Sequence, residues 1–563
     1  MMYNRIVLLG VLFGFAITGP AFAQADSLGH GDRTATLYRD VLRVGDTGKP
    51  LLPLSVLGRQ DRVEIAAPSG LRILGTGDGQ VDIRLPPGRA VEVTPTARQP
   101  GVLRHFVVVG RAAAWDFETL RAEKIKLKDK GLQIKTLSTG TTYSLAGRMF
   151  DTKQTLLCLD HQFDSTTDAQ KRAAELTTTL AAPVGVHTVV EAPPTAELVA
   201  KEKSSAAAEI HAQDVLWFEA LKQTGAATTL KVVGFRGSTR TELELPGRVY
   251  VIVGQQGLEV VNEAEIERIL EGVVASEIFH SAPDAALRAQ AVAARTDMLA
   301  KVGTRHATDP FAICSETHCQ AFRGLERVNA RIAQAVQDTR GQVLVDGEGR
   351  LVDAYYHAAS GGHTENNENA WPGRPQPALR GQPDLVDEGA KSPYPQGVSD
   401  AAVSAMLQTK DRSWAAASGL NAEACRWKIE RSGAELFDQL KGFGVRKPVK
   451  DLRVLRRGVS GRALSLQITD ITGVITQLDG ELRIRDALGG SHGPKGLRSA
   501  LVVIKASTEV KNGAPEAWYF SGAGFGHGVG MDQTGAVARA KNGQDYKTIL
   551  THYYTGAKIE TLY

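Results

Sequence analysis

The sequence predicts a multidomain α+β protein in which β-rich N-terminal modules precede a mixed α+β domain. Short apolar runs rich in β-branched residues, separated by Gly, Pro and Asp, fill the region before residue 115 and indicate strands. After residue 260 the apolar residues recur instead at spacings of three and four, the pattern of amphipathic helices. A chain of 563 residues can hold several cores of about 100 to 200 residues each, so we expect more than one domain.

The charge balance excludes whole classes of partner. Lys and Arg together number 66, and Asp and Glu together number 62, which leaves a formal net charge of +4. This excess is too small for the strong positive field with which nucleic-acid-binding proteins attract phosphates. We therefore expect no nucleic-acid partner and no general attraction to anionic membranes.

The first 23 residues have the pattern of a secretory signal peptide. The basic Arg5 precedes an apolar run over residues 6–18, and a Gly-Pro break and the letters AFA then predict cleavage after Ala23. The alternative is a retained membrane anchor, but the run is shorter than the roughly 20 residues that span a bilayer. No later segment is apolar enough to span one. We expect an exported chain, located in the periplasm or in the cell wall and the extracellular space. It should have no membrane span once the signal is removed.

Changes of pattern along the chain predict four further segments. Residues 24–115 read as a small all-β module, and residues 120–192 as an α+β module with the order strand, strand, helix, strand. The second order resembles the SPOR domain, a small peptidoglycan-binding fold, and an unrelated α+β module is the alternative. Residues 193–228 are rich in Pro, Ala and Ser, so we expect a linker. The denser motifs of residues 229–563 are assigned to one large α+β domain.

The first helix of that domain ends an apolar stripe with a carboxylate. Ile266, Leu270 and Val273 recur at spacings of four and three, and the next member of the series is Glu277. If the helix extends that far, burial disfavours the charged carboxylate and raises its pKa, which is what a general acid requires. In the alternative, the helix ends by Ala275 and Glu277 faces the solvent.

The following helix carries Arg288 and Arg295, which are seven residues apart and share one face. Such arginines are usually solvated. Since the two helices are joined by a short connection, the sequence also permits Arg295 to approach the Glu277 end of the first helix and to bind an anion or a polar sugar there.

Four candidate metal ligands follow within fourteen residues: His306, Cys314, His318 and Cys319. Two thiolates and two imidazoles are a donor set that Zn²⁺ prefers. The spacing is irregular, and an exported protein can instead form a disulfide between Cys314 and Cys319. Both interpretations stay open at this stage.

Two further motifs predict a polar cleft. The turn of Ser360, Gly361 and Gly362 follows a strand and is expected to leave backbone N–H groups free, with Trp371 as an aromatic wall for a sugar ring. Near the C-terminus, the run GFGHGVGMDQ alternates glycine with other residues, which predicts a close approach of the backbone to a neighbour. His527 and Gln533 provide the polar groups of this run.

These blocks, in this order, resemble the SpoIID/LytB family of bacterial cell-wall proteins. The matching stretches include GVVASEIFHSAPDAALRAQAVAARTDMLA, ICSETHCQAFRG, AYYHAASGGHTENNENAWPG and GFGHGVGMDQTGAVARA, and the resemblance covers residues 230–563. It implies a lytic transglycosylase in which Glu277 is the catalytic acid and in which the four His and Cys residues hold one structural zinc ion. Ile278 and Phe279 stand where the family commonly has Met-Pro. The resemblance also supports a set of substrate-binding residues in the same cleft: Gln290, Arg295, Ser360, Gly361, Gly362, His527 and Gln533.

The implied partner is the glycan strand of peptidoglycan, with the prior removal of stem peptides left open. Some members of the family are amidase enhancers, which bind the wall or a cell-wall amidase without cutting glycan. The alternative function is therefore a non-catalytic amidase enhancer. The name of the family does not imply that this chain acts in sporulation.

Overall fold

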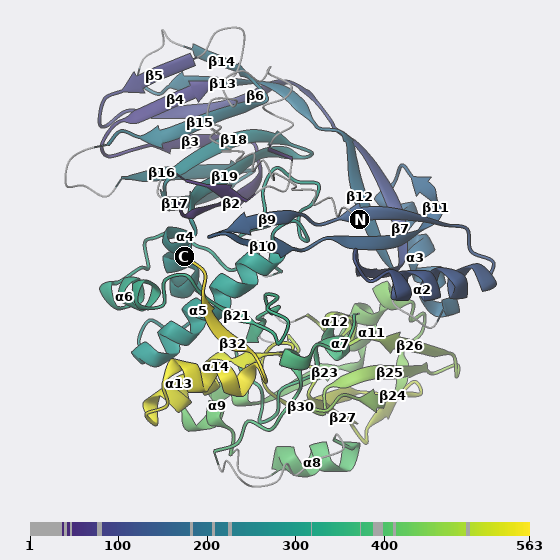
Figure 1. The fold of residues 1–563 in the computed structure, drawn as a ribbon. Helices are drawn as coiled ribbons and strands as arrows, with labels where there is room; N and C mark the ends of the chain where they lie inside the picture. The colour runs from purple at the N-terminus through teal and green to yellow at the C-terminus, as the bar shows by residue number, and fades with distance from the viewer. Residues whose placement is uncertain are drawn as a thin grey trace, which may run out of the picture.

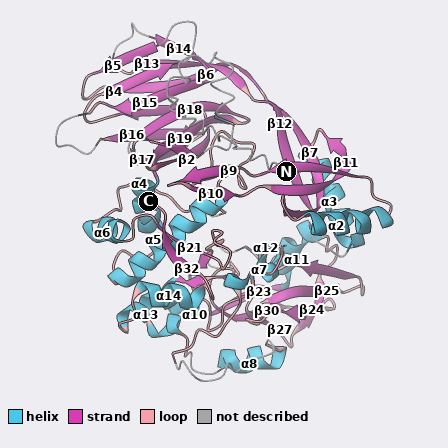
Figure 2. Cartoon of the chain, in the orientation of Figure 1, coloured by secondary structure: helices cyan, strands magenta, loops and turns pink. Residues whose placement is uncertain are grey.

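The computed structural model describes residues 37–38, 42–45, 48–75, 81–180, 184–204, 209–222, 228–316, 318–371, 373–386, 398–408, 412–420, 422–490 and 496–563. The predicted signal peptide lies outside these ranges. A pair of stacked β-sheets forms the upper part of the molecule in Figure 1, a group of helices lies below it, and smaller sheets complete the lower part. Helices and strands are mixed along the chain (Figure 2), so the predicted α+β class is confirmed.

Strands from two separate parts of the chain build the upper sandwich. The eight-stranded sheet has the order β1 (Arg43–Val44), β2 (Pro50–Gln60), β19 (Gly257–Glu265), β18 (Arg248–Gly254), β15 (Val215–Ala220), β4 (Leu71–Gly75) and β5 (Val81–Leu85), with β20 (Ile313–Cys314) beside β2. The six-stranded sheet has the order β14 (Glu209–Gln213), β13 (Thr195–Glu202), β6 (Ala90–Gln99), β3 (Arg62–Ala66), β16 (Thr229–Arg236) and β17 (Thr239–Pro246). Alternate residues of β3 are buried, because each sheet turns one face inward.

This sandwich differs from the predicted segments. Strand β3, which lies within residues 24–115, pairs with β16, so the predicted N-terminal module and the predicted C-terminal domain share one sheet. Residues 193–228, expected as a linker, contain strands β13, β14 and β15. In β13 the alternating Ala196, Leu198 and Ala200 are buried. Their small apolar side chains suit a strand as well as a linker, and strand pairing with β6 decides between the two.

A separate module is inserted between the two parts of the sandwich. It runs through β7 (Val102–Ala113), α2 (Phe117–Asp129), β8 (Ile134–Thr139), β11 (Gln154–Phe163), α3 (Thr166–Leu180) and β12 (Gly185–Ala192). Its antiparallel sheet has the order β12-β7-β11-β8, the βαββαβ arrangement of ferredoxin-like folds. A hairpin, β9 (Thr142–Leu145) and β10 (Arg148–Asp151), leaves this module and buries Tyr143 and Phe150 in the core of the main body.

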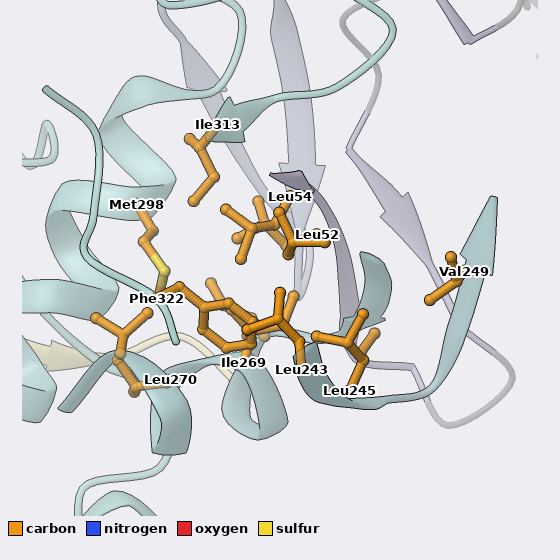
Figure 3. Packing of buried hydrophobic residues seen from close by; sticks show 14 of the residues in the cluster. Leu52, Leu54, Leu243, Leu245, Val249, Ile269, Leu270, Met298, Ile313 and Phe322 are labelled. Atoms are coloured by element: carbon orange, nitrogen blue, oxygen red, sulfur yellow. The ribbon is translucent and has the colours of Figure 1, made fainter. Parts of the chain in front are cut away.

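Three helices close the open end of the sandwich: α4 (Ile266–Glu277), α5 (Asp284–Lys301) and α6 (Ala330–Asp338). Ile269 and Leu270 of α4 and Met298 of α5 pack in the same hydrophobic core as Leu54 of β2 and Leu245 of β17 (Figure 3). Fourteen of the 18 residues of α5 are buried, so this helix is enclosed on every side rather than along one stripe. Among the described helices, none combines the length and the apolar character needed to cross a membrane.

The remaining elements form the lower part of the molecule. Two three-stranded sheets have the orders β23 (Arg426–Ser432), β30 (Ala517–Ala523), β27 (Val502–Ala506) and β24 (Val449–Arg457), β25 (Ala463–Asp470), β26 (Ile475–Asp479). Three short pairs are β21 (Gln342–Val345) with β32 (Lys558–Thr561), β22 (Tyr356–His357) with β31 (Met531–Asp532), and β28 (Val510–Lys511) with β29 (Ala514–Pro515). The helices are α7 (Asn367–Ala370), α8 (Asp400–Gln408), α9 (Trp414–Ala417), α10 (Ala422–Cys425), α11 (Gly433–Leu440), α12 (Glu481–Ala487), α13 (Gln533–Lys541) and α14 (Tyr546–Tyr553), with 3₁₀ turns at Pro377–Leu379 and Lys441–Phe443.

A buried ion pair joins α4 to α5. The guanidinium group of Arg295 donates to both carboxylate oxygens of Glu267, at 2.9 and 2.6 Å, and to the backbone oxygen of Gln342 at 3.0 Å. Arg295 is fully buried, and Glu267 also accepts a hydrogen bond from the hydroxyl of Tyr563 at 2.8 Å. Glu267 is in the first turn of α4, about 15 Å along the helix axis from Glu277. Arg295 is therefore a structural residue at the opposite end of α4.

We predict that Arg295→Ala destabilises the fold by about 3–5 kcal/mol, because it leaves the carboxylate of Glu267 buried without its cation. The matched control is Arg288→Ala on the same helix, where the pair with Asp338 is partly exposed and the loss should be below about 1 kcal/mol. Chemical denaturation of both variants measures the difference. Equal losses in the two variants would contradict the structural assignment of Arg295.

Candidate functional site

Helix α4 extends to Glu277, so the alternative in which it ends by Ala275 is wrong. Glu277 is half-buried, and its Oε1 accepts a hydrogen bond of 2.6 Å from the backbone N–H of Ala321. Its backbone oxygen accepts one of 3.0 Å from Nε2 of Gln533, at the start of α13. The same nitrogen lies 3.3 Å from Oε1 of Gln290, which is fully buried. Among the predicted site residues, the structure thus places Gln533 between the backbone of Glu277 and the side chain of Gln290.

The surroundings of Glu277 favour its protonated form. Burial raises the pKa of this carboxyl group above its ordinary value, and the negative charge of Asp297 adds to the effect. The N–H of Ala321, the charge of Lys301 and a contact with Gln533 act in the opposite direction without cancelling it. A carboxyl group that keeps its proton above the usual range can donate that proton to a leaving group.

A buried polar network holds the segment that supplies this N–H group. Nζ of Lys301 donates to Oδ2 of Asp297 at 2.5 Å and to the backbone oxygen of Cys319 at 2.7 Å. The side-chain amide of Gln320 donates to Asp297 and accepts from the hydroxyl of Tyr356. These contacts fix residues 319–321 against α5. Sequence reasoning missed them, and the signal for them was the Asp297–Lys301 pair at a spacing of four within an alanine-rich helix.

The four predicted metal ligands form one cluster. Their donor atoms all lie within 4.8 Å of one another, with Nε2 of His306 at 3.3 Å from both Nε2 of His318 and Sγ of Cys319. Cys314 and Cys319 are both free thiols, so the predicted alternative disulfide is not formed. The backbone of His306 has a φ of 47°, a left-handed conformation that a non-glycine residue adopts at a cost. Such a held conformation is common at functional sites.

The chemistry around these donors fits a metal cation. Nδ1 of His306 lies 2.8 Å from Oδ2 of Asp309, the carboxylate partner that metal-binding histidines commonly have. Hydrogen bonds from Cys314 and from the two histidines lower the pKa of Cys319, which favours the thiolate that metals bind. Cys314 lies on β20, which pairs with β2 of the sandwich, so the cluster sits where the sandwich meets the helices. These four residues could hold a metal ion.

Two of the N–H groups that we expected to be free in the Ser360–Gly362 turn are bonded inside the protein. The N–H of Ser360 donates to Oδ2 of Asp532 at 2.6 Å, and the N–H of Gly362 donates to Oγ of Ser360 at 3.1 Å. That hydroxyl in turn lies 3.2 Å from Oδ2 of Asp384. Ser360, Asp384 and Asp532 are fully buried. The turn is therefore a structural junction beneath α13, and Arg295, at the far end of α4, is also remote from Glu277.

His527 lies in an aromatic cluster. Its ring centroid is 4.6 Å from that of Trp371, which lies 4.4 Å from the ring of Tyr355, and all three side chains are half-buried. Nδ1 of His527 accepts a hydrogen bond of 3.1 Å from the N–H of Val529. Burial lowers the pKa of His527 well below its usual value, so the ring is neutral at pH 7. Tyr355 immediately precedes Tyr356, whose hydroxyl donates to Gln320 of the network beneath Glu277.

The alternating glycines let the backbone of this run lie very close to other residues of the same chain. A Cβ on Gly522 would come within 2.2 Å of Trp427, and one on Gly528 within 2.4 Å of Arg462. Gly530 would meet the backbone oxygen of Tyr355 at 2.0 Å. The predicted close approach is thus confirmed, but the neighbours are the protein's own side chains and backbone.

Two family models match the chain. One, described as Stage II sporulation protein (SpoIID), matches residues 254–345, and the other, described as a domain of unknown function (DUF8618), matches residues 365–530. The first range contains Glu277, the whole His and Cys cluster, and Asp297, Lys301 and Gln320 of the network beneath Glu277, whereas Tyr356 of that network lies outside it. The second contains His527.

Several curated proteins are similar to this chain. An uncharacterized protein of Brachyspira hyodysenteriae is 31% identical over 324 residues, which are 57% of this chain and 74% of that protein. A Bacillus subtilis protein named amidase enhancer is 28% identical over 307 residues, which are 52% of this chain but 40% of that relative. A Bacillus amyloliquefaciens protein named Stage II sporulation protein D is 25% identical over 352 residues, which are 60% of this chain and 86% of the relative.

We predict that Gly528→Ala lowers the melting temperature more than Gly543→Ala. Both glycines have nearly the same backbone conformation, with φ values of 81° and 83°, so both variants carry the same left-handed strain of about 1–2 kcal/mol. Only Gly528 faces a buried side chain, because nothing lies within 4 Å of a Cβ on Gly543. The excess loss in Gly528→Ala measures the overpacking against Arg462, at about 1–3 kcal/mol. Identical melting temperatures for the two variants would contradict this role of the glycine run.

Proposed function

This chain belongs to the SpoIID/LytB family, and we propose that it is an exported lytic transglycosylase that cleaves peptidoglycan glycan strands with Glu277 as the general acid and base. It acts in the periplasm, or in the cell wall and the extracellular space. The observation that carries the proposal is the state of Glu277: a half-buried carboxyl group with a raised pKa and one oxygen held by a backbone N–H.

A single carboxyl group is sufficient for this reaction. The proton of Glu277 passes to the glycosidic oxygen between N-acetylmuramic acid and N-acetylglucosamine, and the bond from C1 to that oxygen breaks. The muramic acid ring passes through an oxocarbenium-like state, and its own 6-hydroxyl oxygen forms the new bond to C1. The carboxylate of Glu277 takes the hydroxyl proton, so the acid is regenerated and the product is a 1,6-anhydro sugar. No water molecule attacks, so the second carboxylate of a glycoside hydrolase is not needed.

The other nearby carboxylate supports this assignment. Asp297 influences the pKa of Glu277, but it is buried and its Oδ2 is bound by both Lys301 and Gln320. It is therefore engaged in holding residues 319–321 and is unsuited to activating a water molecule. Asp297 therefore affects Glu277 through its charge and by holding the segment that binds the Glu277 carboxylate.

We assign the metal cluster a structural role, with one Zn²⁺ held by His306, Cys314, His318 and Cys319. Four protein ligands complete a tetrahedral zinc site and leave no position for a reacting water molecule. The cluster ends two residues before Ala321, whose N–H binds Glu277. Bound zinc would thus stabilise the loop that orients the catalytic acid.

The second candidate function is a non-catalytic amidase enhancer that binds the wall or a cell-wall amidase. The similarity to the Bacillus subtilis amidase enhancer favours it, although this chain covers 40% of that protein. Binding alone requires no protonated carboxyl group. Glu277→Gln distinguishes the two functions because it keeps the shape of the side chain and removes its acid.

We predict that Glu277→Gln loses glycan cleavage by a factor of roughly 100 or more, since a general acid contributes that much. Cleavage by the wild type should fall as the pH rises through the raised pKa of Glu277. Above a pH of about 4.5 the carboxyl group of Glu277 keeps its proton in the folded chain and loses it in the unfolded chain. The free energy of unfolding therefore falls as the pH rises toward the raised pKa. At pH 7 the melting temperature of the variant should therefore equal or exceed that of the wild type. Mass spectrometry of purified glycan strands, with and without stem peptides, detects the anhydro product.

The matched control is Glu271→Gln on the same helix. Burial also raises the pKa of Glu271, but its carboxylate pairs with Arg268. Cleavage should be unchanged in this control. A Glu277→Gln variant as active as the wild type would rule out the enzyme and leave the amidase-enhancer function.

We predict about one equivalent of zinc per chain, which Cys314→Ser should lose. The control variant Cys158→Ser should retain it, because Cys158 is buried in the inserted module, away from the cluster. Metal analysis of the purified variants measures this. Chelation should lower the melting temperature, because the site forms only in the folded chain. A mass spectrum that shows Cys314 bonded to Cys319 in the native protein would contradict the zinc site.

A further inference from the structure

Two exposed aromatic side chains occupy the turn that leads from β7 into α2. Trp115 is 54% exposed and Phe117 is 74% exposed. The N–H of Phe117 donates to the backbone oxygen of Trp115 at 3.1 Å, so the two residues belong to one tight turn. Single exposed apolar side chains are common on protein surfaces, but two exposed aromatic rings so close together indicate a binding surface. We call the side chains of Trp115 and Phe117 the aromatic platform.

Two loops of the main body hold the turn of the aromatic platform, on the side where α2 faces the lower part of the molecule (Figure 1). The guanidinium carbon of Arg350 lies 5.8 Å from the ring centroid of Trp115, and Arg350 is itself paired with Asp346 at 2.8 Å. Next to Trp115, Oδ2 of Asp116 accepts a hydrogen bond of 2.6 Å from Arg374. A surface that is fixed before a ligand arrives loses little entropy on binding.

Arg374 also connects the aromatic platform to Trp371 of the candidate site. The backbone oxygen of Asn367 accepts a hydrogen bond of 2.9 Å from the N–H of Trp371. The side-chain amide of Asn367 donates to the backbone oxygen of Arg374 at 2.8 Å. Three residues of chain span at most about 11 Å, so Trp371 and Arg374 are near neighbours. The aromatic platform therefore continues the predicted aromatic wall at Trp371.

Trp371 is connected in turn to the end of α4 that carries Glu277. Its ring lies 4.4 Å from that of Tyr355, whose backbone oxygen accepts a hydrogen bond of 3.1 Å from the N–H of Met531. Gln533 follows Met531 by two residues and donates to the backbone oxygen of Glu277 at 3.0 Å. Consecutive contacts thus lead from the proposed catalytic acid through Trp371 to the aromatic platform.

The exposed face of α2 does not suit insertion into a membrane. One stripe of this face consists of Phe117, Arg121, Ile125 and Lys128, which are all exposed. Cations interrupt the apolar side chains along the stripe, so it lacks the continuous apolar face that enters a bilayer. A sugar ring, in contrast, needs one flat aromatic surface and polar groups around it.

We propose that Trp115 and Phe117 bind sugar rings of the glycan strand by stacking, so that the inserted module extends the glycan-binding surface beyond Trp371. This inference rests on the proposed function. The C–H groups on one face of a sugar ring pack against the electron-rich face of an aromatic ring. The hydroxyl and amide groups at the edge of the sugar stay free to bind polar side chains or water.

Binding in a cleavage-deficient background tests the aromatic platform. Full-length Glu277→Gln protein and its double variants with Trp115→Ala or Phe117→Ala are titrated with purified, peptide-free glycan strands. Trp115→Ala should weaken binding about tenfold and Phe117→Ala about threefold, because each removes a stacking ring. Trp115→Phe keeps a ring and should retain most of the affinity. These differences should persist in about 1 M salt, which screens charges but not stacking.

The matched control is Tyr519→Ala in the same background. Tyr519 is an exposed aromatic residue on β30, outside the inserted module, so glycan binding should be unchanged. Equal melting temperatures of the variants show that the module stays folded. Phe117→Ala leaves the contact between Arg350 and Trp115 intact, so it tests stacking even where Trp115→Ala loosens the module.

The outcomes separate the hypotheses. Unchanged glycan affinity in both Trp115→Ala and Phe117→Ala overturns the aromatic platform, as does equal weakening in Tyr519→Ala or a difference that vanishes in high salt. Vesicles of phosphatidylglycerol and phosphatidylethanolamine provide a further arm. Vesicle binding that Trp115→Ala removes while glycan affinity stays unchanged identifies a membrane as the occupant and overturns the proposal. Cleavage is measured separately on protein with Glu277 intact, so failure of the platform leaves the lytic reaction untouched, and failure of the lytic reaction leaves the binding data intact.

Discussion

The enclosure of helix α5 is the constraint on which the rest of the structure depends. Its many alanines let α4, α6, α13 and β21 approach it closely, and 14 of its 18 residues are buried. Every polar side chain on it must then find a partner inside the protein, because an unpaired buried charge is costly. Gln290 contacts Gln533, Arg295 pairs with Glu267, and Asp297 pairs with Lys301. Gln533 and Glu267 come from elements packed against α5. The Asp297–Lys301 pair lies within α5 and binds the backbone oxygen of Cys319 and the side chain of Gln320, which follow α5 in the chain. Helix α5 thus determines how its neighbours are placed.

The environment of Glu277 follows from this arrangement. One hydrogen bond to its carboxylate comes from the segment after the His and Cys cluster, and another contact, to its backbone oxygen, comes from the start of α13. These segments are more than forty and more than two hundred residues away in the chain. The Lys301–Asp297 pair holds the first segment against α5, and pairing of β20 with β2 ties the cluster to the sandwich. The acid thus depends on elements that are far from it in sequence.

The sequence by itself determined the features that depend on neighbouring residues. The period of Ile266, Leu270 and Val273 predicted the helix and left open whether it reaches Glu277. The four metal-ligand candidates lie within fourteen residues, so a short loop can gather them. The tertiary structure decided which distant groups meet. The partner of Arg295 turned out to be Glu267, and the N–H groups of Ser360 and Gly362 were already bonded inside the protein. The expected linker contains β13, β14 and β15 of the sandwich. Periodicity reports which face of an element is buried, whereas the identity of a buried partner depends on which elements pack together, and that is settled only when the whole core forms.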